Sequence, residues 1–210
     1  MKPIMVFDVE TTGLPLWNEP SDDPRQPHLV QLAALLVDAD TRQVISTLDV
    51  IVQPDGWLIP EDVAQVHGIT TEKAAALGVP ESLAIELLLA MHEKAELRVA
   101  HNETFDARIL RIGIKRFFPD DIDDQLADAW KAAPARCTQR LSTPILQLPP
   151  TDRMRAAGRT HYKSANLGEA YRYFFGEEFE GAHSALADVQ ACARVYFEIQ
   201  DRAARAPAAA

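Results

Sequence analysis

The chain has 210 residues, 47% of them hydrophobic, and carries a formal net charge of −10. At this length and hydrophobic content the chain can bury one good-sized core; length favours one domain or at most two, and we predict one. The acidic balance argues against a broad basic surface for nucleic acid, but a site in which bound cations meet phosphates remains compatible with it.

The cysteines and the N-terminus indicate the compartment. Cys137 and Cys192 lack metal-ligand spacing and are expected to be small buried side chains in a reducing environment. The N-terminus has no signal-peptide pattern, and the most apolar helical stretch, residues 83–91, is too short to cross a bilayer. We therefore expect a cytoplasmic protein without membrane contact.

Residues 3–10 form the first expected element, an apolar strand that ends in Asp8 and Glu10. Alternate residues of a strand share a face, so both carboxylates project the same way with Cα atoms roughly 6.5 Å apart. Two like charges at the end of a buried strand are costly, and a divalent cation is the usual compensation. The alternative is a pair of solvated acids beside a turn, because the D-x-E pattern alone is common.

A loop and a hairpin follow this strand. Residues 14–28 contain four prolines, which forbid a helix or a central strand, so a surface loop is expected beside the acids. Trp17 in this loop either stacks on a base or packs under its own loop. Residues 29–37 and 44–52 predict a hairpin, which completes an antiparallel three-stranded meander with the first strand.

Helices and a short strand are expected in the middle of the chain. A short helix over residues 61–66 leads to His67, and a longer helix begins at Pro80. The apolar face of the longer helix is expected to run through Leu83, Leu87, Leu88 and Met91.

A short strand over residues 97–100 precedes a helix that carries Phe105 and Asp106 and buries Ile109, Leu110 and Ile112. Asp106 falls in the first turn, where an anion either complements the helix dipole or serves a site.

The last third of the chain is less regular. Helices are expected over residues 120–131 and 166–175, whereas the boundaries between residues 134 and 150 stay open. Residues 151–164 predict a loop that contacts a phosphate backbone or is simply solvated. This loop is locally basic through Arg153, Arg155, Arg159 and Lys163. Residues 204–210 are expected to form a disordered tail.

His183 and Asp188 precede or begin the last predicted helix. Inside one regular helix they would lie about 140° apart and would not share a face. If Ser184 is the N-cap, His183 lies in the preceding loop and can swing over a metal ion held by Asp188. A surface or capping histidine is the alternative, since this spacing alone is not specific.

Four acids and one histidine thus come from a strand end and two helix starts. The segment Asp8-Val9-Glu10-Thr11-Thr12-Gly13, with the segments at 67–69, 101–106 and 183–188, resembles the exonuclease motifs of the DEDDh (DnaQ-like) family. That family includes the bacterial polymerase proofreading subunit and ribonuclease T. The likeness covers about residues 4–200 without a departure at the acids or the histidine. The 14–28 insertion and the long loop before Asn166 are less familiar, which leaves the substrate open.

The resemblance implies an α/β, ribonuclease-H-like fold with a mixed five-stranded sheet and helices on both faces, in one exonuclease domain over residues 1–203. It implies hydrolysis of single-stranded DNA or frayed 3′ ends to nucleoside 5′-monophosphates, with two Mg²⁺ or Mn²⁺ ions as cofactors. Trimming of RNA 3′ ends is the close alternative, because no single residue of the sequence indicates whether the site accommodates or contacts a 2′ hydroxyl. A nuclease-fold docking module of a polymerase complex is the alternative from another class.

The same resemblance assigns roles to residues. It implies that Asp8 bridges both ions, that Glu10 and Asp188 complete one ion site, that Asp106 supports the other, and that His183 accepts a proton from the attacking water. A polymerase, a repair protein and a second copy of the chain are candidate partners. Expected substrate contacts are the backbone amides of Thr11 and Thr12, the apolar edges of Leu14, His67 and Phe105 against the last base, and Asn102, which holds a phosphate or orients its helix.

Overall fold

The first strand, β1, lies at the centre of a five-stranded sheet with the order β3-β2-β1-β4-β5. This computed structural model describes residues 1–205. β1 pairs antiparallel with β2 and parallel with β4, so the sheet is mixed, as predicted. The predicted meander is also confirmed, because β2 pairs antiparallel with β3. The strands are β1 (Pro3–Thr11), β2 (Leu29–Asp38), β3 (Val44–Ile51), β4 (Leu97–Ala100) and β5 (Ala135–Cys137).

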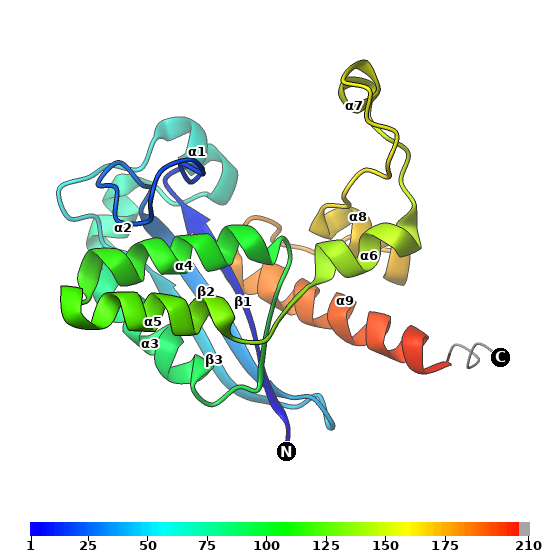
Figure 1. Ribbon diagram of the computed structural model, residues 1–210, viewed down its shortest axis with the longest axis horizontal. Coiled ribbons are helices and arrows are strands. Elements are labelled where there is room, and N and C mark those ends of the chain that lie inside the picture. Colours follow the sequence, from blue (N-terminus) through cyan, green and yellow to red (C-terminus); the bar gives the residue numbers. More distant parts are fainter. Residues whose placement is uncertain (206–210) are drawn as a thin grey trace.

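Helices cover both faces of this sheet, with α3, α4 and α5 on one side and α9 with α8 on the other (Figure 1). The helices are α1 (Glu61–His67), α2 (Thr71–Leu77), α3 (Glu81–His92), α4 (Glu103–Phe117), α5 (Asp120–Ala132), α6 (Thr138–Leu146), α7 (Asp152–Ala156), α8 (Leu167–Phe175) and α9 (Ala185–Arg205).

The alternation of side chains along β1 separates the two layers of the core. Met5 and Phe7 pack with α3, α4 and α5, whereas Ile4 and Val6 pack with α9. Because the side-chain period of a strand is two, Asp8 and Glu10 belong to the α9 side of the sheet. The strand that fills the core thus also aims both acids at the last helix.

The buried face of α3 agrees with the prediction at Leu88 and Met91 and differs from it at Leu83 and Leu87. Leu83 and Leu87 are 41% and 39% exposed, while Ala84, Ile85 and Leu88 are fully buried. The physical reason is close approach between helices: the side chain of Ile85 occupies the space that a Cβ at Gly113 of α4 would need. Because Gly113 has no side chain, α3 can turn Ile85 and its neighbour Ala84 toward α4, which leaves Leu83 and Leu87 partly exposed.

Several elements were not predicted. One of them is α2, which Thr70 caps: the hydroxyl of Thr70 accepts a hydrogen bond from the amide of Lys73 at 3.2 Å. The open interval after residue 134 contains β5 and α6. α9 continues through Arg205, so the predicted domain end at residue 203 falls inside a helix, and residues 206–210 of the predicted tail lie outside the described residues.

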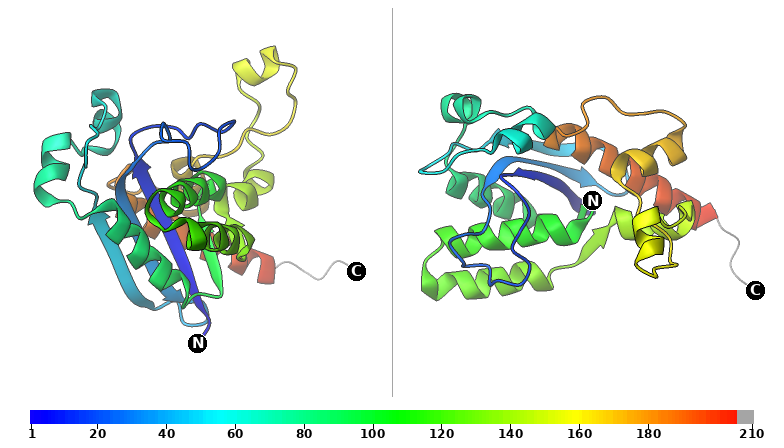
Figure 2. Two further views of the ribbon diagram at one scale, coloured as in Figure 1. Left: turned by 60° about the vertical axis from the view of Figure 1, so that its left-hand side comes forward. Right: turned by 90° about the horizontal axis from the view of Figure 1, so that it is seen from above.

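The basic segment 151–164 was predicted as a loop but begins with the short helix α7, whose first turn Thr151 caps, and it projects from the body of the molecule next to α6 and α8 (Figures 1 and 2). Arg155 pairs with Asp152 and Lys163 pairs with Glu169, so two of its four cations already have an anionic partner. Arg153 and Arg159 are exposed on the same projection. Contact with a phosphate backbone stays a prediction for this segment.

Both cysteines are buried and neither forms a disulfide in the described chain, which agrees with the expected buried thiols. Among residues 1–205, none of the helices combines the length and the apolar character that a bilayer crossing requires.

Candidate active site

The site lies at the carboxyl end of β1, where a strand and the starts of two helices converge. Asp8 and Glu10 follow the buried residues Ile4 and Val6 on the face that packs against α9. Burial raises the pKa of Asp8 well above its usual range, and the charges of Asp106, Asp188 and Glu10 raise it further. The four carboxylates are therefore close enough to interact electrostatically.

Asp106 enters from the first turn of α4. The chain turns into this helix through Asn102, whose left-handed φ of 65° redirects the backbone after β4. The side chain of Asp106 is 2% exposed, and its Oδ2 has no hydrogen-bond partner in the described chain. Burial raises the pKa of Asp106 well above its usual range. An unpartnered buried carboxylate oxygen among other acids fits a cation-binding role better than dipole complementation alone.

His183 and Asp188 come from the start of α9. His183 has a φ of 68° and lies before the helix, whereas Asp188 is in its first turn, as predicted. The amide of His183 donates to Oδ2 of Asp188 at 3.2 Å. This bond attaches the loop that carries the imidazole to the acid of the helix.

The ligand atoms of Glu10, His183 and Asp188 all lie within 4.8 Å of one another. Burial, and then the charge of Asp188, raise the pKa of Glu10 to about 7. Burial raises the pKa of Asp188 to about 6, while the hydrogen bond from His183 opposes the rise. Carboxylate oxygens that repel each other in this way suit a hard divalent ion such as Mg²⁺ or Mn²⁺.

The predicted substrate residues just after β1 have internal partners. The hydroxyl of Thr11 donates to the carbonyl of Gly13 at 2.8 Å. The amide of Thr12 donates to the carbonyl of His28 at 3.0 Å, a bond that the predicted contact with a 3′ hydroxyl did not anticipate. Leu14 is 78% exposed, so its side chain is accessible to a ligand.

The other three predicted contacts lie on different elements. His67 is buried at the end of α1, where its Nδ1 accepts from the amide of Ile69 at 3.1 Å, and burial lowers its pKa. Phe105 is half-buried against the core on the α4 side. Asn102 is exposed at the start of α4 and makes no side-chain capping bond, and both its contact with a phosphate and its orienting of the helix stay predictions.

The geometry can be compared with known proteins. A sequence profile described as Exonuclease matches residues 5–196. The chain belongs to the Exonuclease family. This match confirms the family resemblance that the motifs indicate, although no curated protein matches the chain in a direct search.

Solved structures show the same fold. E. coli Exonuclease I in complex with a dA16 oligonucleotide superposes with a TM-score of 0.71 at 21% identity, covering 98% of this chain and 42% of that chain. The zinc ion bound form of the E. coli ExoI-ssDNA complex gives 0.70 at 18% identity, with the same coverage. Exonuclease I from Methylocaldum szegediense gives 0.66 at 20% identity, again covering 98% and 42%. The chain therefore spans less than half the length of these proteins.

Two residues without a role in the sequence-based prediction connect segments around the site, although one of them, His101, lies in the motif segment 101–106. Gln31 pairs with Glu10 across β1 and β2. Its Oε1 accepts from the amide of Ala185 at 3.2 Å, and its Nε2 donates to Asp49 at 2.7 Å. Gln31 thus fixes the start of α9 to the sheet. A polar residue in the otherwise apolar run of residues 29–37 was the available signal.

His101 is the second such residue. Its Nε2 lies 3.0 Å from the carbonyl of Ala165, and its Nδ1 lies 2.9 Å from the hydroxyl of Thr138. A carbonyl only accepts, so Nε2 carries the proton and Nδ1 accepts from the hydroxyl. Burial lowers the pKa of His101 to about 4, which keeps the ring neutral in this role.

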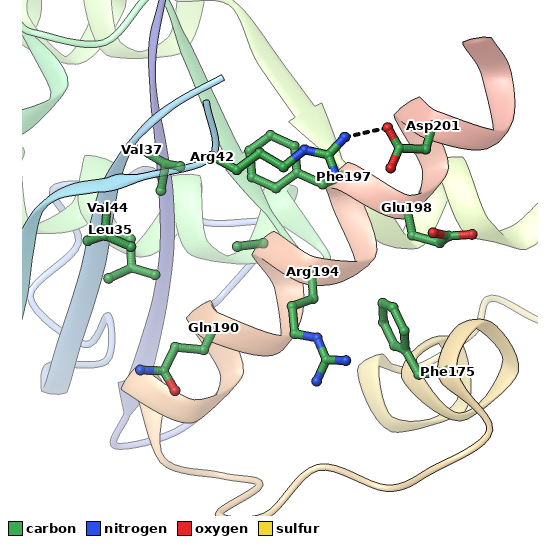
Figure 3. A pocket seen from close by; sticks show the side chains of 11 residues that line it. Leu35, Val37, Arg42, Val44, Phe175, Gln190, Arg194, Phe197, Glu198 and Asp201 are labelled. Atoms are coloured by element: carbon green, nitrogen blue, oxygen red, sulfur yellow. Dashed lines mark hydrogen bonds and ion pairs between the residues drawn. The ribbon is translucent and has the colours of Figure 1, made fainter. Parts of the chain in front are cut away.

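A pocket of about 480 Å³ opens between the start of α8 and the start of α9 and includes His183 and Asp188. A second pocket, of about 410 Å³, lies between the β2–β3 hairpin and α9 and contains the ion pair of Arg42 with Asp201 (Figure 3). None of the predicted site residues lines the second pocket. Of these two pockets, the first is therefore the one that reaches the site, through Asp188 and His183.

Proposed function

We propose that this protein is a metal-dependent 3′–5′ exonuclease of the DEDDh type, which releases nucleoside 5′-monophosphates from single-stranded DNA or frayed 3′ ends. The observation that carries the proposal is the convergence of Asp8, Glu10, Asp106 and Asp188 with His183 at the end of β1. Membership of the Exonuclease family supports the reaction class.

The four carboxylates fit a pair of divalent ions. Asp8 feels the charges of the other three acids, which supports its proposed position between two ion sites. Glu10 and Asp188 would complete one site, and the buried, unpartnered oxygen of Asp106 would face the other. Two bound Mg²⁺ or Mn²⁺ ions would supply stabilisation of charge on the phosphate and on the leaving oxygen.

His183 would act as the general base. Its imidazole is exposed in the loop before α9, while its backbone is held by Asp188. An imidazole can accept a proton from water at neutral pH, and the exposed position lets the ring pass that proton on to solvent.

The main proposed substrate contacts come from the loop after β1 and from the start of α4. Leu14 and Phe105 would bracket the last base through their apolar edges, and Asn102 would hold a phosphate. Thr11 and the edge of His67 would contribute the remaining contacts, whereas the amide of Thr12 already donates to the carbonyl of His28 and is left out of the proposal. Several solved relatives are complexes with single-stranded DNA, which supports DNA over RNA as the first substrate to test.

The test is digestion of 5′-labelled single-stranded DNA and matched RNA, each with Mg²⁺ or EDTA. We expect a metal-dependent ladder that shortens from the 3′ end for the wild type and for Asp55→Ala, which changes an exposed acid. Asp8→Ala should produce no ladder. The preferred polymer decides between the DNA and RNA hypotheses.

Failure of folded wild type to cleave either polymer would reject the enzymatic proposal and favour a docking module of a polymerase complex. A polymerase or repair partner, a homodimer and a cytoplasmic location stay predictions.

A further inference from the structure

A cationic pocket of about 260 Å³ lies on the outward side of α4, between the 14–28 loop and α5. Arg108 and Arg111 line it from α4, Lys131 from α5 and Trp17 from the loop. Arg108 lies two residues after Asp106, and Arg111 lies five residues after it. Successive helical residues are separated by about 100°, so these arginines face away from the acidic centre. The pocket shares none of the four acids.

The floor of the pocket is fixed by internal bonds. The indole of Trp130 donates to the carbonyl of Ala107 at 3.0 Å, and the guanidinium of Arg98 lies over the Trp130 ring at 4.4 Å. Arg98 also pairs with Glu103 at 2.9 Å, which neutralises the one carboxylate in the lining. The remaining charge of the pocket is therefore positive.

Arg108 and Arg111 have few partners among the described residues. Within residues 1–205, the Nε atoms of Arg108 and Arg111 are buried without a hydrogen-bond partner. Arg108 donates to the carbonyl of Glu19 at 2.5 Å, and Arg111 lies 3.9 Å from a carboxylate oxygen of Asp128, which is 75% exposed. The charges of these two guanidinium groups repel each other, and a phosphate in the pocket would relieve that repulsion.

Trp17 supplies the other half of a nucleotide-binding surface. Its side chain is 52% exposed at the edge of the pocket, although it belongs to a loop that is otherwise fastened to the protein. An exposed indole beside arginines is a suitable platform for stacking a base whose phosphate meets the cations.

We propose that this pocket binds one nucleotide, with its phosphate held by Arg108, Arg111 and Lys131 and its base stacked on Trp17. The inference extends the proposed function, on which it rests for the source of the nucleotide. An upstream unit of a bound single strand and a released nucleoside 5′-monophosphate have the same recognisable chemistry.

The experiment is calorimetric titration in EDTA with dAMP, inorganic phosphate or a single-stranded DNA of about twelve nucleotides. Without metal, the acidic centre repels phosphate, so binding reports on the cationic pocket. The variants are Arg111→Gln/Lys131→Gln and Trp17→Ala. The matched control, Lys94→Gln/Arg205→Gln, removes the same charge from two exposed positions outside this pocket. Thermal melts establish that every variant is folded.

We expect the wild type and the control to bind dAMP, and Arg111→Gln/Lys131→Gln to bind it about tenfold more weakly or worse. Trp17→Ala should weaken binding of dAMP but not of inorganic phosphate. If the strand binds more tightly than dAMP and the same variants lose that binding, the pocket holds an upstream nucleotide of the bound strand. If the strand and dAMP bind equally, the pocket holds the released nucleoside 5′-monophosphate.

Two results would overturn the inference. One is the absence of dAMP binding by wild type in EDTA, or binding that both pocket variants retain. The other is equal affinity for dAMP and inorganic phosphate together with no effect of Trp17→Ala, which would reduce the pocket to an anion site. Neither result bears on metal-dependent digestion, so the proposed exonuclease activity is tested separately.

Discussion

At the scale of single residues, His183 combines an exposed imidazole with an anchored backbone. His183→Ala should lower kcat by about 10²–10⁴-fold, the usual contribution of general base catalysis, while Mg²⁺ binding survives on the acids. Single-turnover digestion and a metal titration measure the two effects. His161→Ala, which changes an exposed histidine in the projecting segment, is the control. Unimpaired turnover of His183→Ala between pH 6 and 9 would exclude the role.

The raised pKa values of Glu10, about 7, and Asp188, about 6, predict competition between protons and metal. A protonated carboxylic acid is a poor ligand, so Mg²⁺ affinity should increase as the pH rises through this range. Calorimetric titration of the protein with Mg²⁺ at pH 5.5 and pH 8 measures the difference. Equal affinity at both pH values would show that these two acids do not hold the ion.

At the scale of elements, the start of α9 depends on Gln31. Gln31→Leu keeps a similar volume but leaves the amide of Ala185 and the carboxylate of Asp49 without their partner. We expect activity to fall about 10–100-fold, as for other residues that orient metal ligands. Hydrogen exchange should accelerate at residues 183–188 but not in β1. Gln43→Leu, at an exposed position of the hairpin, is the control, and equal loss in both variants would contradict the positioning role.

At the scale of the whole molecule, the four acids cost the metal-free protein stability. Their pKa values are higher in the folded chain than in the unfolded one, so the folded state binds more protons between pH 4 and pH 7. Stability of the metal-free protein should therefore fall as the pH rises through this interval.

Asp8→Asn tests this cost directly. At pH 8 in EDTA the variant should melt roughly 2–4 °C above wild type, the shift expected for about 1 kcal/mol in a chain of this size. The difference should disappear near pH 4, and Mg²⁺ should raise the melting temperature of wild type more than that of the variant. Thermal melts monitored by circular dichroism provide the measurement, with Asp55→Asn as the control. A variant less stable than wild type at pH 8 would contradict the electrostatic account.

Much of the fold was predictable because it follows from local patterns. Neighbouring residues indicate the boundaries of three elements: the apolar strand that ends near Asp8, the β-branched hairpin, and the helix between Asn166 and Gly176. The buried face of α3 was not, since it depends on Gly113, which comes more than twenty residues later in the chain. β5 has only three residues, too few for a periodic pattern to identify.

The acids, the histidine and the elements that carry them could be predicted from the sequence, because motif spacing and side-chain periodicity are local properties of the chain. Three contacts appear only in the folded chain: Gln31 meets Ala185, His101 meets Ala165, and, outside the acidic centre, Trp17 meets the arginines of α4. These contacts connect segments far apart in the chain. Their physical basis is long-range packing and hydrogen bonding, which local spacing in the sequence does not specify.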